Sequence, residues 1–199
     1  SMGTPASARR ALAATLEPIA VMASGAAFAG LARLNSDGSL DDSFPWSSLG
    51  QGKMVPWEDR FYIASTTIIR RVLYSGANDL SFTMSNALGL FTPLQGGDYH
   101  VFPDGRLVMS GLHTLSDTAR GFVGYHNFIW FSNTGHLDTT RTHRKGNGKL
   151  STFLKLPDGK FIASGTCTVY DGRPTSWIKR MHPDGSLDTT FFSGVNWGR

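Results

Sequence analysis

The sequence predicts an all-β protein built from about four repeated antiparallel meanders. Two short signatures alternate along the 199-residue chain, and each places a turn motif between two apolar, β-branched stretches. These stretches are too short for stable helices, and the chain has no apolar run long enough to cross a bilayer. We therefore expect short strands joined by turns, and no membrane span.

The first signature centres on a Pro-Asp-Gly turn. It reads FPDGRLVMSG at 102–111 and LPDGKFIASG at 156–165, with weaker copies at 57–66 (WEDRFYIAST) and 16–25 (LEPIAVMASG). Pro presets φ, the Asp side chain accepts from nearby backbone, and Gly supplies a positive φ. This motif predicts a hairpin.

The second signature is an Asp-Gly turn followed by an acidic and hydroxylic segment. It reads RLNSDGSLDDSF at 33–44 and RMHPDGSLDTTF at 180–191, with weaker copies at 131–140 (FSNTGHLDTT) and 72–82 (VLYSGANDLSF). Because the two signatures alternate four times, each unit is expected to form a four-stranded meander. We predict one repeat domain over 16–199, with units at about 16–44, 45–84, 85–140 and 141–199.

This pairing of signatures resembles the delta-sixty repeat, a bacterial β-propeller repeat whose function is mostly unassigned. The resemblance covers the chain from about Leu16 onward. It implies a β-propeller-like fold of about four blades, each a four-stranded antiparallel meander. It implies very little about function, because one fold serves many functions.

Residues 1–15 are expected to lie outside the repeats. Ser1 and Met2 resemble an expression scar, and the stretch 5–17 is rich in Ala and Leu after a Pro, which is typical of a short helix. A degenerate outer strand or a tail explains the same stretch, so both interpretations stay open.

The placement of the carboxylates argues against an enzyme. Of the 13 Asp, only Asp98, Asp117 and Asp171 lie away from the repeated turns, where local hydrogen bonds explain a carboxylate. The chain also has no Gly-x-Ser-x-Gly and no phosphate-binding loop followed by a helix. A hydrolase that uses Asp98, Asp117 or Asp171 remains an alternative.

Neither a metal nor a cofactor is expected. If Asp37 and Gly38 were part of a calcium loop, its first and last ligands would be Arg33 and Phe44, which cannot bind a cation. The six His have no paired spacing typical of zinc sites, and Cys167 is the only cysteine and lies in an apolar run. Cys167 is interpreted as a buried, inert thiol.

The longer loops are the predicted binding face. In a meander both tight turns of a unit lie at one edge, so the longer loops and connections share the opposite edge. Acidic and basic residues recur there at matched positions, and Tyr170 and Trp177 could supply aromatic platforms for a sugar. Alternatively, the charges tie down their own loops and the rings are buried. The candidate ligand-binding residues are Asp117, Arg120, Arg141, His143, Arg144, Tyr170, Asp171, Arg173 and Trp177.

We interpret the protein as a noncatalytic binding or adhesion module that recognises a surface glycan or a partner protein at the cell surface or outside the cell. A self-assembling structural repeat is the other interpretation. The net charge is +4 and the pI is near 9.4, but the charges are scattered, which argues against a nucleic-acid partner. A homo-oligomer is expected, because pairing of copies would cover apolar faces at the ends of an open row of blades.

Overall fold

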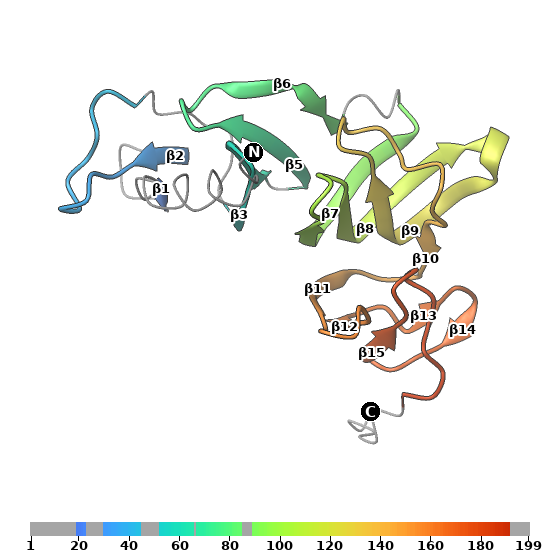
Figure 1. Ribbon diagram of the computed structural model, residues 1–199. Coiled ribbons are helices and arrows are strands. Elements are labelled where there is room, and N and C mark those ends of the chain that lie inside the picture. The colour runs from blue at the N-terminus through green and yellow to red at the C-terminus, as the bar shows by residue number, and fades with distance from the viewer. Residues whose placement is uncertain (1–18, 23–29, 45–51, 66, 85–88, 192–199) are drawn as a thin grey trace, which may run out of the picture.

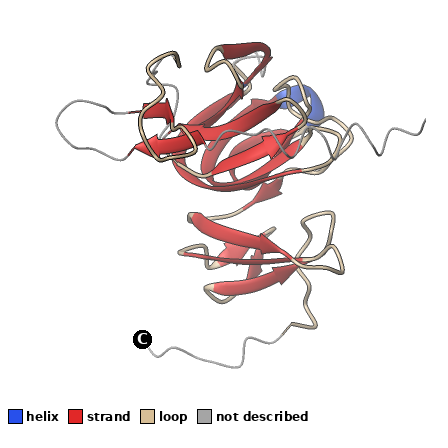
Figure 2. Ribbon diagram, turned by 60° about the vertical axis from the view of Figure 1, so that its left-hand side comes forward, coloured by secondary structure: helices blue, strands red, loops and turns tan. Residues whose placement is uncertain are grey.

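The computed structural model describes residues 19–22, 30–44, 52–65, 67–84 and 89–191, and within them the chain forms short antiparallel strands (Figures 1 and 2). Helical structure among these residues is limited to the 3-10 turn η2 (Thr118–Arg120) and to Met84. The mostly β, antiparallel fold that the sequence predicts is confirmed. The N-terminal helix considered for residues 5–17 lies outside the described residues.

The described residues form five sheets, of which the four main ones follow one another along the chain and are numbered sheets 1 to 4. Sheet 1 pairs β1 (Ile19–Met22) with β2 (Gly30–Arg33). Sheet 2 contains β3 (Met54–Trp57), β4 (Arg60–Ser65), β5 (Ile68–Leu73) and β6 (Asn78–Thr83). Sheet 3 contains β7 (Phe91–Val101), β8 (Leu107–Asp117), β9 (Phe122–Phe131) and β10 (Arg144–Lys145). Sheet 4 contains β11 (Leu150–Lys155), β12 (Phe161–Gly165) and β15 (Ile178–Met181).

Two features of this topology differ from a uniform meander. A small hairpin of β13 (Val169–Tyr170) and β14 (Arg173–Pro174) is inserted between β12 and β15. Strand β10 pairs with β9, so sheet 3 extends past residue 140, where the sequence places a unit boundary. In the described residues, sheets 2 and 3 are the four-stranded ones.

The tight turns form as the two signatures predict. The turn glycines have φ between 78° and 90°, and each donates its N–H to the carbonyl three residues earlier; they are Gly38, Gly76, Gly105, Gly135, Gly159 and Gly185. The weak copy of the first signature at 57–66 differs, because Glu58 takes the positive φ in a two-residue turn between β3 and β4. Local turn chemistry therefore fixes the hairpins before any packing is considered.

Alternate residues of sheet 3 belong to two different cores. Met109, Ile129 and Phe131 pack with Tyr62 and Phe82 of sheet 2. The residues between them face the other way: Val108, Phe128 and Trp130 pack with sheet 4, in a cluster with Phe153, Phe161 and Met181. Because side chains of a strand alternate between faces, one sheet can be buried on both sides by its two neighbours.

The same arrangement holds between sheets 1 and 2. Leu31 and the buried Phe44 pack with Phe61, Ile63 and Val72. The four sheets thus pack face to face in chain order, and sheets 1 and 4 lie at opposite ends of the row (Figure 1). No helix in the part of the chain that the structure describes is long and apolar enough to cross a membrane.

Candidate functional site

One Asp of each second signature is held by its own turn. Its Oδ1 accepts from the hydroxyl two residues later at 2.6 Å and from that residue's N–H at 2.9 to 3.0 Å. The four pairs are Asp41 with Ser43, Asp79 with Ser81, Asp138 with Thr140, and Asp188 with Thr190. These carboxylates therefore order the turn.

The other oxygen of this Asp binds cations from the same unit. Arg71 contacts Asp79 at 2.6 Å and Arg60 contacts it at 2.8 Å. In sheet 4, Arg180 and Lys160 bind Asp188 at 2.8 and 2.9 Å. Because Arg60 and Lys160 follow the first turn, the Asp ties both turns of its unit together.

The pKa of Asp79 reflects this arrangement. Burial by itself would raise that pKa, but the hydrogen bonds from Ser81 and Arg71 lower it to about 2. The carboxylate is therefore ionised and fully engaged at neutral pH.

A cation–π pair recurs at a spacing of eleven residues. Arg33 lies over Phe44, Arg71 over Phe82 and Arg180 over Phe191, with distances of 5.1, 5.2 and 4.9 Å to the ring centroid. In sheet 3 the two residue types are exchanged: Arg141 lies over Trp130 at 4.9 Å. Arg141, a predicted ligand residue, is thus engaged by the core, and the exchange explains why the signature is weak in this unit.

The three carboxylates considered for a hydrolase lie in three separate environments. Asp98 accepts from Lys53 at 2.9 Å and from the Tyr99 N–H at 2.7 Å. Asp117 is 2% exposed, caps η2 and pairs with Arg120 at 2.8 Å. Asp171 accepts from the Lys145 N–H at 3.0 Å. Within the described residues no three His, Cys, Asp or Glu side chains are placed to hold a metal ion.

Asp117, Arg120 and His143 come together at the loop end of sheet 3, but two of them are buried. His143 is 3% exposed, and its Nδ1 accepts from the Trp130 N–H at 3.2 Å. Burial lowers the pKa of His143 to about 4, so the ring is neutral at physiological pH. Asp117 and His143 are therefore buried where the sequence pattern predicts exposed polar groups, and Arg120 is the exposed member of this group.

Arg144, Tyr170, Asp171 and Arg173 form a second group around the β13–β14 hairpin. Arg144 contacts Asp171 at 3.3 Å and also Asp184, in a tight turn, at 2.8 Å. The long loop thus reaches the tight-turn edge, which departs from the predicted separation of the two edges. Tyr170 is fully buried and donates to the Gly185 carbonyl at 2.8 Å, so it cannot serve as an exposed platform.

The loop between β12 and β15 exposes the remaining two candidates. Trp177 is 61% exposed and Arg173 is exposed. The base of this loop is fixed by Asn147, whose Oδ1 accepts from the Thr168 and Val169 N–H groups at 3.0 and 2.9 Å. The loop therefore presents a ring and a guanidinium from a rigid base.

Sequence reasoning missed two residues of that base, Asn147 and Lys179. Lys179 is 1% exposed and donates its Nζ to the Cys167 carbonyl at 3.0 Å, and burial lowers its pKa. The signal for Asn147 is the Gly146-Asn147-Gly148 sequence. A Cβ at Gly148 would lie 2.8 Å from the Thr166 carbonyl oxygen, so the loop packs directly on this backbone.

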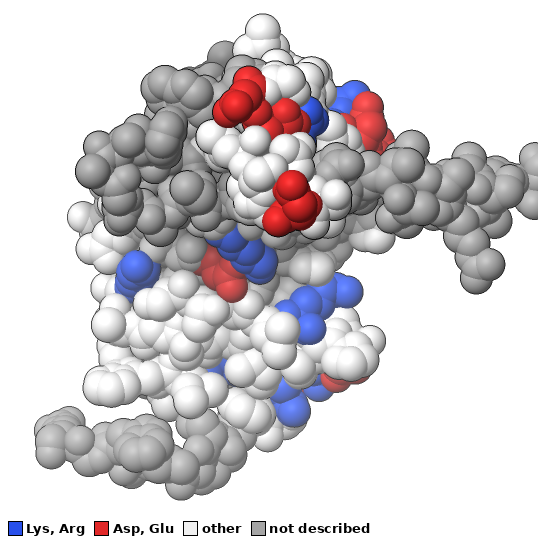
Figure 3. All heavy atoms as spheres, turned by 90° about the vertical axis from the view of Figure 1, so that its left-hand side faces the viewer, with Lys and Arg blue, Asp and Glu red and all other residues white. Residues whose placement is uncertain are grey.

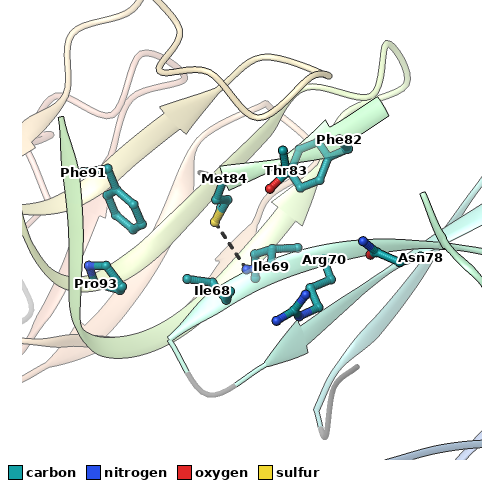
Figure 4. A pocket seen from close by; sticks show the side chains of 9 residues that line it. All are labelled: Ile68, Ile69, Arg70, Asn78, Phe82, Thr83, Met84, Phe91 and Pro93. Atoms are coloured by element: carbon teal, nitrogen blue, oxygen red, sulfur yellow. Dashed lines mark hydrogen bonds between the residues drawn. The ribbon is translucent and has the colours of Figure 1, made fainter. Parts of the chain in front are cut away.

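A cavity of about 390 Å³ lies between sheets 2 and 3 (Figure 4). Its walls come from β5, β6 and the start of β7, and neither carboxylates nor imidazoles line it. It is lined by Ile68, Ile69, Arg70, Asn78, Phe82, Thr83, Met84, Phe91 and Pro93. The sequence did not indicate it, because its walls come from two different units.

Charged side chains do not form one continuous stripe on the face shown in Figure 3. Lys and Arg form separate groups there, and some lie beside Asp or Glu. The described residues visible on that face therefore do not form a dense basic stripe such as nucleic-acid binding proteins carry.

Comparison with known families adds one result. A family model described as a domain of unknown function (DUF5122) beta-propeller matches residues 21–44 and 156–191. This match supports a β-propeller repeat family. The matched segments contain the first copy of the second signature and both signatures of sheet 4. A search of curated proteins found no match.

Proposed function

We propose that the protein is a noncatalytic binding module of the β-propeller type. The finer architecture in this proposal is four blades related to the delta-sixty repeat, with sheets 1 to 4 as their cores. The recognised ligand is a surface glycan or a partner protein, at the cell surface or outside the cell.

The observation that carries this proposal is the rigid loop that exposes Arg173 and Trp177. Its base is held by Asn147 and by the hydrogen bond from the Gly165 N–H to the Trp177 carbonyl at 3.1 Å. A loop that is ordered before binding loses less conformational entropy on binding. An exposed indole and an exposed guanidinium on one loop suit a sugar ring with polar substituents, or a protein hot spot.

The state of the carboxylates supports a noncatalytic role. General acid–base chemistry needs a carboxyl group that can exchange protons with a substrate. Asp98, Asp117 and Asp171 are each engaged by a cation or a backbone N–H, and Asp117 is buried.

The test is a glycan array probed with the labelled protein and with the variants Trp177→Ala and Arg173→Ala. We expect each variant to weaken binding by about tenfold or more while the melting temperature stays unchanged. Leu80→Ala and Lys155→Ala are matched controls, because both residues are exposed and lie on other strands.

Two results would contradict the proposal. One is binding that stays the same in both loop variants. The other is turnover of a bound glycan that is lost in Asp117→Asn or Asp171→Asn, because this would make the protein a hydrolase.

A further inference from the structure

The face of sheet 4 that points away from sheet 3 is uncovered. Leu154 and Ile178 lie on it and are 66% and 43% exposed. Ile178 lies two residues before Arg180. Its counterparts, two residues before Arg71 in sheet 2 and before Trp130 in sheet 3, are Ile69 and Phe128, which are 4% and 0% exposed. In those sheets the next sheet of the row covers the position, whereas nothing in the described chain covers Ile178.

The arginine on this face lacks the contact that its counterparts make. Arg33 of sheet 1 donates to the Tyr74 carbonyl of sheet 2 at 3.4 Å, and Arg71 of sheet 2 donates to the Asn133 carbonyl of sheet 3 at 2.8 Å. Tyr74 and Asn133 occupy the same place in the second turn of their units. The hydrogen bonds described for Arg180 are all within its own unit, to Asp188 and Thr190.

The opposite end of the row lacks the matching contact. A Cβ at Gly76, in the second turn of sheet 2, would meet the Phe44 ring of sheet 1 at 2.7 Å, whereas a Cβ at Gly38 would meet nothing within 4 Å. Leu40, two residues after Gly38, is 44% exposed, whereas its counterpart Leu137 in sheet 3 is 4% exposed. The turn of sheet 1 thus has the shape that receives a preceding unit, but none of the residues that the structure describes covers it.

We propose that two copies of this chain dock head to tail, with the outer face of sheet 4 in one copy covering the first turn and Leu40 of sheet 1 in the other. The contacts repeat those within the chain. Arg180 donates to the Ser36 carbonyl, Phe191 packs over Gly38 as Phe44 packs over Gly76, and Leu154 and Ile178 are buried.

The occupant is a second copy for two reasons. Sheets 1 and 4 lie at opposite ends of the row, so they do not meet within one molecule (Figure 1). Each end also offers what the other lacks. One end has a guanidinium and apolar side chains, and the other has a turn carbonyl and a glycine that no other described unit contacts. Such an interface joins two different surfaces. Repeating it therefore builds either an open row of copies or a closed ring.

The first experiment is sedimentation of the full chain over a range of concentrations. We expect the wild type to sediment as a multiple of 21.6 kDa, and the double variant Leu154→Glu with Ile178→Glu to sediment at 21.6 kDa. Leu80→Glu is the control, because Leu80 is 81% exposed on sheet 2 and should leave the mass unchanged from the wild type. A wild type that is monomeric at its highest soluble concentration overturns the proposal, and so does an oligomer that the double variant retains.

The second experiment separates head-to-tail docking from pairing of like faces. Leu40→Glu blocks only the sheet 1 end, so this variant should be monomeric by itself. A mixture of Leu40→Glu with the sheet 4 double variant should form a dimer of one copy of each, since one intact end of each kind remains. Self-association of Leu40→Glu, or a mixture that stays monomeric, overturns the proposal. Circular dichroism of each variant excludes misfolding as the cause.

Discussion

At the scale of single residues, the buried aspartates hold the turns of their units together. Asp79 accepts from Ser81 and from two arginines, while the exposed Asp158 accepts only from the Lys160 N–H at 3.1 Å. The same Asp type therefore carries different amounts of stability at different places in the repeat.

Asp79→Ala should lower the free energy of unfolding by about 3 kcal/mol, because it leaves the buried Arg71 without its counter-ion. Asp158→Ala should cost less than about 1 kcal/mol, the effect of losing a local capping bond. Urea unfolding of both variants measures the difference. Equal losses of unfolding free energy in the two variants would contradict the role of Asp79 in holding both turns of its unit together.

Acid should destabilise the fold through its buried imidazoles. Burial lowers the pKa of His113 and of His143 from 6.5 to about 4, so the unfolded chain takes up protons below pH 6.5 that the folded chain refuses. Stability should fall as the pH drops from 6.5 to 4, by roughly 3 kcal/mol for each ring. Below about pH 4, protonation of Asp79 adds a further loss down to its folded pKa of about 2.

The variant His143→Asn checks this, because an amide oxygen can replace Nδ1 as acceptor for the Trp130 N–H but does not titrate there. Its stability, measured by urea unfolding at several pH values, should depend less on pH between 6.5 and 4 than that of the wild type. An unchanged slope would show that His143 does not carry this effect.

At the scale of elements, the base of the loop between β12 and β15 is held by a side chain from the preceding connection. Asn147 accepts from two N–H groups of this loop and donates to the Thr168 hydroxyl at 3.0 Å. The order of the loop therefore comes from the connection that precedes β11.

Asn147→Ala should make this loop more mobile without removing a proposed ligand contact. We expect a loss of about 1 to 2 kcal/mol in stability and faster hydrogen exchange at the Thr168 and Val169 amides. Asn133→Ala is the control, because its side chain makes one long hydrogen bond of 3.4 Å at the surface. Unchanged exchange at both amides would mean that other contacts order the loop.

Hairpins were predictable from the sequence, and so were Arg173 and Trp177 as exposed loop residues, but the burial of the other candidates was not. Pro-Asp-Gly and Asp-Gly turns are set by residues that are adjacent in the chain, and Gly105 and Gly159 have the expected positive φ. The burial of Tyr170 and His143 depends on which sheet packs over them, which no local pattern specifies. Strand β10 was missed because it pairs with β9 across a long connection. The β13–β14 hairpin was missed because each of its strands has two residues.

At the scale of the whole molecule, similar units stack in a row. In each unit an Asp accepts from a hydroxyl two residues later and pairs with an arginine. The exchanged pair in sheet 3 is the most informative part of this repeat. Arg141 lies over Trp130, whereas the arginine precedes the ring by eleven residues in the other three units. If the units are equivalent, the two positions should accept either order of the two residue types.

A double-mutant cycle at these two positions tests that equivalence most directly. Trp130→Arg alone places two guanidinium groups together and should be strongly destabilising, and Arg141→Phe alone removes the cation. Combining both substitutions recreates the order of Arg71 and Phe82, and places a guanidinium at the position from which Arg71 binds Asp79. We predict that urea unfolding gives a favourable coupling energy of about 1 kcal/mol or more. A double variant as unstable as the sum of the two single variants would contradict the equivalence of the units.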